Sequence, residues 1–170
     1  MVKAKKDVNY GKAWTALAVA RITIGFVFLW AFLDKTMGLG FATKPGKSWL
    51  DGVSPTSGFL NFGVNAKSPF ADFFHGLAGN VLVDWLFMLG LLGIGMALIL
   101  GIGLRVAAVS GTALLLMMWA AEFPLENNPL VDDHIVYAVV LWAVAFAPRK
   151  FSLTKQWLET PTVKKNPWLW

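Results

Sequence analysis

The sequence contains no cysteine and is poor in charge. Without a thiol, the chain has no disulfide bond, no thiolate metal ligand and no cysteine-bound sulfur intermediate. Charged residues make up 15% of its 170 residues, against about 25% in a typical soluble domain. The charges gather in tails and loops and leave long apolar runs between them, a distribution that predicts an integral membrane protein.

The short motifs of several enzyme classes are missing as well. The sequence has no phosphate-binding loop, no nucleophile elbow and no paired-histidine metalloprotease motif. Its net charge of +5 would suit nucleic acid, but the basic residues lie mainly beside apolar runs and form no basic groove. Nucleic-acid binding is therefore not expected.

Four apolar segments predict an all-α fold, an integral membrane four-helix bundle. We expect its helices at about residues 13–33, 85–104, 106–121 and 130–147. The first segment resembles a cleaved signal peptide in its basic flank, but it is long, contains Arg21 and lacks a small-residue exit. The fourth segment covers about 27 Å at the rise of a helix, which barely matches a hydrocarbon core of about 30 Å.

The longest polar stretch, residues 34–80, is predicted to be an outer loop that carries short amphipathic helices, because its prolines exclude one continuous helix. An apolar stripe with i, i+3, i+4, i+7 spacing predicts one such helix, which begins at Pro69 with Ser68 as its cap and lies on the membrane or across the bundle mouth. The stripe consists of Phe70, Phe73, Phe74 and Leu77. Residues 1–12 form a basic tail, and residues 148–170 form a basic tail rich in tryptophan.

Arg21 is the single charge within the first apolar segment. It lies roughly 12 Å along the predicted helix, where an arginine costs between about 2.5 and 17 kcal/mol and has to be paired or to face a polar cavity. Ser110 on the third segment is predicted to lie at the same depth. Arg21 is then either a hydrogen-bonded structural arginine or a donor to a quinone carbonyl, an anionic lipid or a substrate.

The densest polar cluster lies at residues 127–137, where the fourth apolar segment begins. Its polar and ionisable members include Asn128, Asp132, Asp133, His134 and Tyr137. Asn128 is expected to cap the helix, with Pro129 at its first position. The cluster then serves either as helix cap and hydrogen-bonding group, or as a proton-transfer or quinone-head site with Asp133, His134 and Tyr137 as catalytic residues. A metal site is conceivable with His75, Glu122 and Glu126, which lie on the same predicted side. The spacing matches no established metal motif, so no metal ion is expected.

Four stretches of the chain resemble the DoxX/DoxD family of four-helix membrane proteins. They are Arg21 followed by GFVFLW at 25–30, WLDGVSPTSGFL at 49–60, GIGMALILGIGLR at 93–105 and NPLVDDHIVY at 128–137. The resemblance covers nearly everything from residue 13 to residue 147, and its last motif is the most specific. This family includes the large, quinone-associated subunit of thiosulfate:quinone oxidoreductase.

The resemblance implies redox work in the plasma membrane, in which electrons pass from a sulfur compound or another reductant to the quinone pool of the respiratory chain. The implied cofactor is a quinone, and the polar residues of the apolar segments supply Arg21, Ser110 and Tyr137 as its expected contacts. The expected partners are membrane lipid and either further membrane-protein subunits or a second copy of this chain. The alternative function is that of a non-catalytic accessory subunit of a larger respiratory complex.

The distribution of basic residues predicts the orientation of the chain in the membrane. The two tails and the turn at Arg105 carry ten Lys and Arg residues, against four on the opposite side. The positive-inside rule therefore places both termini in the cytoplasm and residues 34–80 outside. Membrane-impermeant labelling from the outer side is expected to reach residues 36–80. Labelling of Trp168 from that side would invert the predicted orientation.

Overall fold

The computed structural model describes residues 10–169, and within that range the chain forms helices and irregular segments without a strand. Three of these helices are long and apolar enough to cross a membrane: α1 (Gly11–Met37), α4 (Val81–Leu100) and α5 (Leu104–Glu122). A fourth apolar helix, α6 (Asp133–Phe146), is shorter. Residues 1–9, which make up most of the predicted basic tail, and Trp170 lie outside the described residues.

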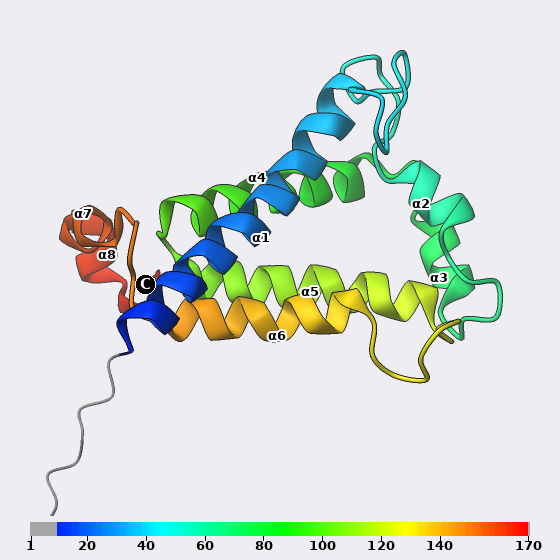
Figure 1. Cartoon of the computed structure of the whole chain (residues 1–170). Coiled ribbons are helices and arrows are strands. Elements are labelled where there is room, and N and C mark those ends of the chain that lie inside the picture. The colour runs from blue at the N-terminus through cyan, green and yellow to red at the C-terminus, as the bar shows by residue number, and fades with distance from the viewer. Residues whose placement is uncertain (1–9, 170) are drawn as a thin grey trace, which may run out of the picture.

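The four apolar helices pack as neighbours in a closed order. α1 lies along α4, α4 contacts α5, α5 lies along α6, and α6 returns to α1 (Figure 1). α1 begins beside the last turns of α6 and diverges from that helix along its length. Their shared core is apolar, and its fully buried side chains include Met88, Leu98, Leu104 and Leu141. The all-helical prediction is thus confirmed, together with three membrane-length apolar helices.

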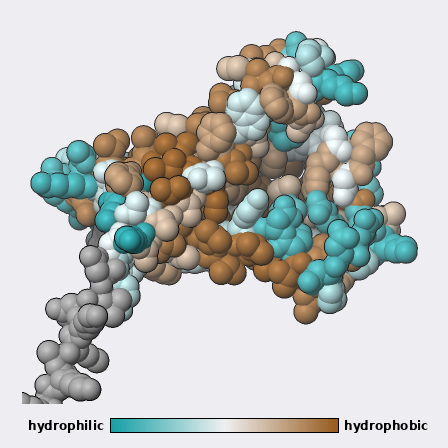
Figure 2. Space-filling model, in the orientation of Figure 1, coloured by the Kyte–Doolittle hydropathy of each residue, from teal (hydrophilic) through white to brown (hydrophobic). Residues whose placement is uncertain are grey.

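The surface of these helices is apolar on the face that Figure 2 shows, where brown side chains cover the middle of the molecule and teal side chains gather at its ends. Large apolar side chains of the four helices are exposed; Leu86 of α4 is 63% exposed and Val139 of α6 is 65% exposed. An apolar belt between two polar ends is what a hydrocarbon layer requires of a spanning protein.

The helix that follows the polar cluster begins later than the sequence suggests. Asp132 is its N-cap, and the Asp132 side chain accepts a hydrogen bond from the Ile135 amide at 3.1 Å. Asn128 instead accepts bonds from the amides of Leu130 and Val131, both at 2.9 Å, which fold the chain into a turn before the helix. The prediction that Asn128 caps this helix is wrong, and α6 has 14 residues, a length of about 21 Å.

The boundary between α4 and α5 also differs from its predicted position. α4 ends at Leu100, four residues earlier than expected, because Gly101 adopts a left-handed φ of +70° and its amide bonds back to Ala97. Gly103, with a φ of +53°, then leads directly into α5. Glycine takes these φ values without steric cost, so the tight turn depends on both glycines.

The loop between α1 and α4 contains α2 (Ser57–Phe62) and α3 (Ala71–Gly76). Two buried carboxylates at the ends of the long helices fasten this loop. Asp34 accepts a hydrogen bond from the Thr43 amide at 2.8 Å, and Asp84 accepts one from the Thr56 hydroxyl at 2.5 Å. α3 begins after Phe70 rather than at Pro69, and the Ser68 hydroxyl donates to the Ala120 carbonyl of α5 at 2.9 Å.

The C-terminal tail folds into α7 (Thr154–Glu159), α8 (Pro161–Lys165) and the 3-10 turn η1 (Pro167–Leu169). These elements lie beside the start of α1, at the end of the molecule opposite α2 and α3 (Figure 1). The Leu153 amide donates to the Leu100 carbonyl at 2.8 Å, and the Thr154 hydroxyl donates to the Gly101 carbonyl at 2.5 Å. The tail is therefore fixed to the turn between α4 and α5.

α1 and α4 approach so closely that glycine is required at their contact. A Cβ atom added to Gly95 would lie 2.7 Å from the Leu29 backbone nitrogen, and one added to Gly25 would lie 2.9 Å from the Leu98 Cβ. Gly93, on the same helix as Gly95, has no atom within 4 Å of its added Cβ. Small residues at one helix face allow this kind of backbone contact in a membrane.

We expect Gly95→Ala to lower the free energy of unfolding by about 1–3 kcal/mol, because the added methyl group forces α1 and α4 apart. Gly93→Ala is the matched control, and it is expected to leave stability unchanged or to raise it by up to about 1 kcal/mol through helix propensity. Thermal unfolding in detergent measures both changes. Equal effects of the two substitutions would contradict the close contact.

Candidate functional site

Three ionisable side chains from two helices converge at the end of the molecule that carries α2 and α3. Glu122 is the last residue of α5, Asp132 is the N-cap of α6, and His134 lies in the first turn of α6. One donor atom from each of these side chains lies within 4.8 Å of the others. His134 Nδ1 is 2.8 Å from Asp132 Oδ2 and 3.7 Å from Asp133 Oδ1. The predicted neighbours Asp133 and His134 are thus brought together with Glu122.

The electrostatics of this cluster favour ionised Asp132. Burial raises the pKa of the Asp132 carboxyl, but hydrogen bonds from His134 and from the Ile135 amide, together with the charge of His134, hold that pKa below its ordinary value. The positive end of the α6 dipole acts in the same direction. Within residues 10–169, no lysine or arginine forms a salt bridge with Glu122, Asp132 or Asp133.

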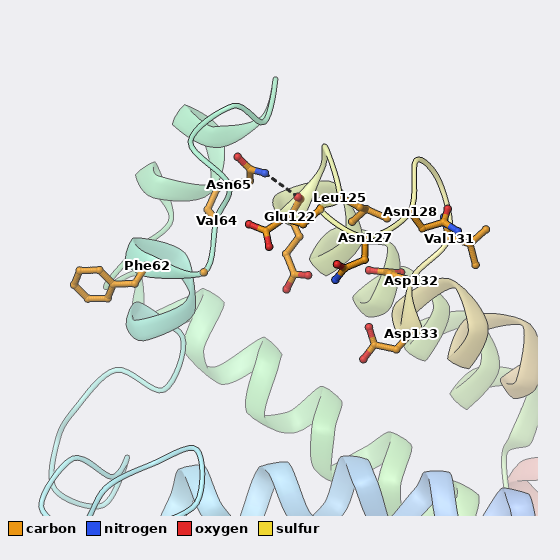
Figure 3. Close-up of a pocket in the computed structure, with 12 residues that line it drawn as sticks. Phe62, Val64, Asn65, Glu122, Leu125, Asn127, Asn128, Val131, Asp132 and Asp133 are labelled. Carbon is orange, nitrogen blue, oxygen red and sulfur yellow. Dashed lines mark hydrogen bonds between the residues drawn. The ribbon is translucent and has the colours of Figure 1, made fainter.

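Glu122 and Asp132 of this cluster, together with Asp133, line one wall of an open polar pocket with a volume of about 600 Å³. Figure 3 shows Glu122, Asn127, Asp132 and Asp133 around this space, while Phe62 on the opposite wall points away from it. The Asn65 amide donates to the backbone carbonyls of Glu122, at 3.4 Å, and of Pro124, at 2.9 Å. These bonds join the loop after α2 to the end of α5 and so complete the pocket.

A second pocket, of about 480 Å³, is almost entirely apolar. It lies between α4 and α5, next to α2 and α3. Phe87, Gly90 and Ile94 line it from α4, and Leu114 and Met118 line it from α5. Phe59, Leu60, Phe74 and Leu77 close it from the loop. α2 lies between the two pockets, since residues 59–60 line the apolar pocket and residues 62–65 line the polar one.

Few polar groups reach the apolar pocket. Lys35 and Thr56 line it at the end nearer the loop, and the Lys35 ammonium lies 5.8 Å from the centre of the Phe87 ring. Ser110 lines it further along α5, where its hydroxyl donates to the Val106 carbonyl at 2.8 Å. Of the predicted quinone contacts, Ser110 is the one that lines this pocket.

Arg21 lies at the opposite end of the molecule and is 2% exposed. Its Nη2 donates to the backbone carbonyls of Lys150, at 3.1 Å, and Phe151, at 2.7 Å. A Cβ atom at Gly101 would collide with the Arg21 guanidinium, so the glycine turn after α4 also makes room for it. Arg21 and Ser110 therefore do not form the pair that equal depth suggested, and the hydrogen bonds of Arg21 are those of a structural arginine that holds the tail.

Tyr137 lies one turn beyond Asp133 on α6, as their spacing predicts, and its ring packs against the apolar core. Glu122, which the sequence places on the same side as His75 and Glu126, belongs to the cluster although it lies ten positions before Asp132. Lys35 was missed from the sequence alone, and it belongs to the apolar pocket although it follows a buried aspartate at a helix end.

Comparisons with protein-family models, with curated proteins and with solved structures give no match to this chain. The functional argument consequently depends on the two pockets and on the residues that line them.

The lowered pKa of Asp132 predicts a specific pH dependence of stability. A carboxyl whose pKa is lower in the folded state stabilises the fold above its unfolded pKa of about 3.9, and that contribution disappears as the pH falls through the folded pKa. The Asp132→Asn variant keeps the capping oxygen but cannot ionise. Thermal unfolding of both proteins between pH 7 and pH 3 measures the effect. We expect the stability of the wild type relative to the variant to decline below about pH 4; a constant difference would contradict it.

Proposed function

We propose that this chain is a quinone-associated redox subunit of the plasma membrane, similar in role to the DoxX-type proteins that its motifs resemble. The observation that carries the proposal is the apolar pocket between α4 and α5, with Lys35 and Thr56 at one end. In this proposal the pocket binds an isoprenoid quinone, and a partner protein supplies electrons from a sulfur compound or another reductant.

The shape and lining of the pocket fit such a ligand. Its volume of about 480 Å³ lies within the range of about 300–1,000 Å³ for small-molecule sites. Along α4 it extends from Val83 to Ile94, roughly 16 Å at the helical rise, so it is long as well as apolar. An isoprenoid tail is long and apolar, and it would contact the side chains of Ile94, Leu114 and Met118.

The end of the pocket near the loop supplies the polar contacts that a quinone head requires. The Lys35 ammonium can donate to a carbonyl oxygen. The Thr56 hydroxyl already donates to Asp84, so Thr56 is held in position by that carboxylate. In this placement the quinone head contacts Lys35 and not Arg21, because Arg21 is hydrogen-bonded to the tail.

A quinone accepts two electrons and two protons when it is reduced, so its site needs a route for protons. On the other side of α2, Asp133 lines the polar pocket, and its Oδ1 lies 3.7 Å from His134 Nδ1. In the proposal these two residues exchange protons with the outer solution, and Tyr137 extends the path along α6. Because the chain contains no cysteine, a sulfur intermediate would have to be carried by a thiol of the partner protein.

Gly90→Leu tests whether the pocket binds a quinone. Gly90 lines the apolar pocket and has no atom within 4 Å of an added Cβ, so a leucine side chain there would occupy the ligand volume. We expect at least about a tenfold loss in affinity for a short-chain quinone analogue, or about 1.4 kcal/mol, measured by tryptophan fluorescence quenching. Gly93→Leu is the matched control, because Gly93 is equally uncrowded, lies on the same helix and does not line the pocket.

Lys35→Met provides a second readout, and it is expected to weaken the binding of the quinone analogue while the affinity for a hydrocarbon of similar length stays unchanged. The proposal would be overturned if the purified protein carried no quinone and also bound none of the added analogue in titrations. This result would favour the accessory-subunit alternative. Equal binding by the Gly90→Leu and Gly93→Leu proteins would place any quinone outside this pocket.

A further inference from the structure

The cluster at the end of α5 has the donor set of a metal site. Glu122 and Asp132 each offer a carboxylate oxygen and His134 offers a ring nitrogen, and these three atoms lie within 4.8 Å of one another. Two carboxylates and one imidazole form a mixed oxygen and nitrogen set, which suits divalent first-row metal ions. The donors come from two different helices, so the fold and not local sequence brings them together.

The electrostatic position of Glu122 supports a bound cation. Glu122 lies at the C-terminal end of α5, where the helix dipole disfavours a carboxylate. Its neighbours Asp132 and Asp133 add negative charge. Across the described part of the chain, the Glu122 carboxylate receives no hydrogen bond and no salt bridge from lysine or arginine. A half-buried carboxylate in this position is stabilised by a positive ion close to it.

We propose that Glu122, Asp132 and His134 bind one divalent metal ion of the zinc or manganese class. Metal–ligand distances of about 2.0–2.2 Å place the donor atoms of a tetrahedral site about 3.3–3.6 Å apart. Donor atoms that now lie within 4.8 Å of one another would close to that spacing, and the 2.8 Å His134 Nδ1–Asp132 Oδ2 pair would widen to admit the ion. The ion takes the place of the proton between His134 Nδ1 and Asp132 Oδ2, so with the ion bound the proton exchange of the proposed function falls to Asp133. Asp132 Oδ1 keeps its bond to the Ile135 amide, so capping and metal binding are compatible.

The surroundings provide both access and the remaining ligands. Glu122 and Asp132 line the polar pocket of about 600 Å³, from which water molecules can complete the coordination shell. Asn65 holds the backbone of Glu122 through its amide, which positions this ligand from the loop after α2. The bound ion would link the end of α5 to the start of α6. It would thereby hold together the two ends of residues 123–132, the segment that connects these helices.

The test is a titration of the full chain, purified in detergent and stripped with a chelator, with zinc chloride and separately with manganese chloride. Calorimetry measures affinity, and electron paramagnetic resonance reports bound manganese. We expect one saturable site, with at least about tenfold weaker binding by Glu122→Gln and by Asp132→Asn. Glu126→Gln is the matched control, since Glu126 lines the same pocket but lies outside the three-donor cluster.

Thermal unfolding provides an independent readout, because a ligand that binds the folded state raises the midpoint temperature. Added metal is expected to raise that temperature for the wild type and for Glu126→Gln, and not for Glu122→Gln. The inference is overturned if the wild type shows no saturable binding, or if Glu122→Gln and Glu126→Gln bind the ion equally. No quinone is present in these titrations, so their outcome is separate from that of the proposed function.

Discussion

The short length of α6 constrains both ends of the structure. α5 has 19 residues and α6 has 14, a difference of about 7 Å in helix length. At one end, the chain leaves α5 at Glu122 and returns to start α6 at Asp132, which places two carboxylates and His134 side by side. At the other end, the chain leaves α6 early enough for its backbone to meet Arg21.

The contact at Arg21 explains how a charge is accommodated within an apolar helix. The carbonyl groups of Lys150 and Phe151 lie outside a helix and so have no intrahelical hydrogen-bond partner. They accept hydrogen bonds from the Arg21 guanidinium instead. The tail that carries these carbonyls is fixed in turn to the α4–α5 turn through Leu153 and Thr154. One buried cation and a set of backbone carbonyls thereby stabilise the tail end of the molecule. The loop end is left with the polar pocket and the apolar pocket on the two sides of α2.

The sequence predicted the helices well and the contacts poorly, for physical reasons. Long apolar runs predict helices in a membrane because backbone groups there must bond within the segment. The hydrogen-bond partners of Arg21 could not be identified from the sequence, because they are backbone carbonyl groups and every residue has one. α4 ends where Gly101 adopts a positive φ. From the sequence alone, Gly103 was an equally plausible glycine to end this helix, two residues later. The side chains of Asn128 and Asp132 both accept hydrogen bonds from backbone amides that follow them, and only the bond to Asp132 caps α6.

The central claim is that the space between α4 and α5 is a binding site for an isoprenoid lipid. The most direct measurement is an electron cryomicroscopy map of protein extracted from native membrane with its lipids. The account predicts elongated density that contacts Gly90 and Leu114 and ends near Lys35. A map in which side chains fill this space, or in which the bound lipid lies beside Arg21 instead, would contradict it.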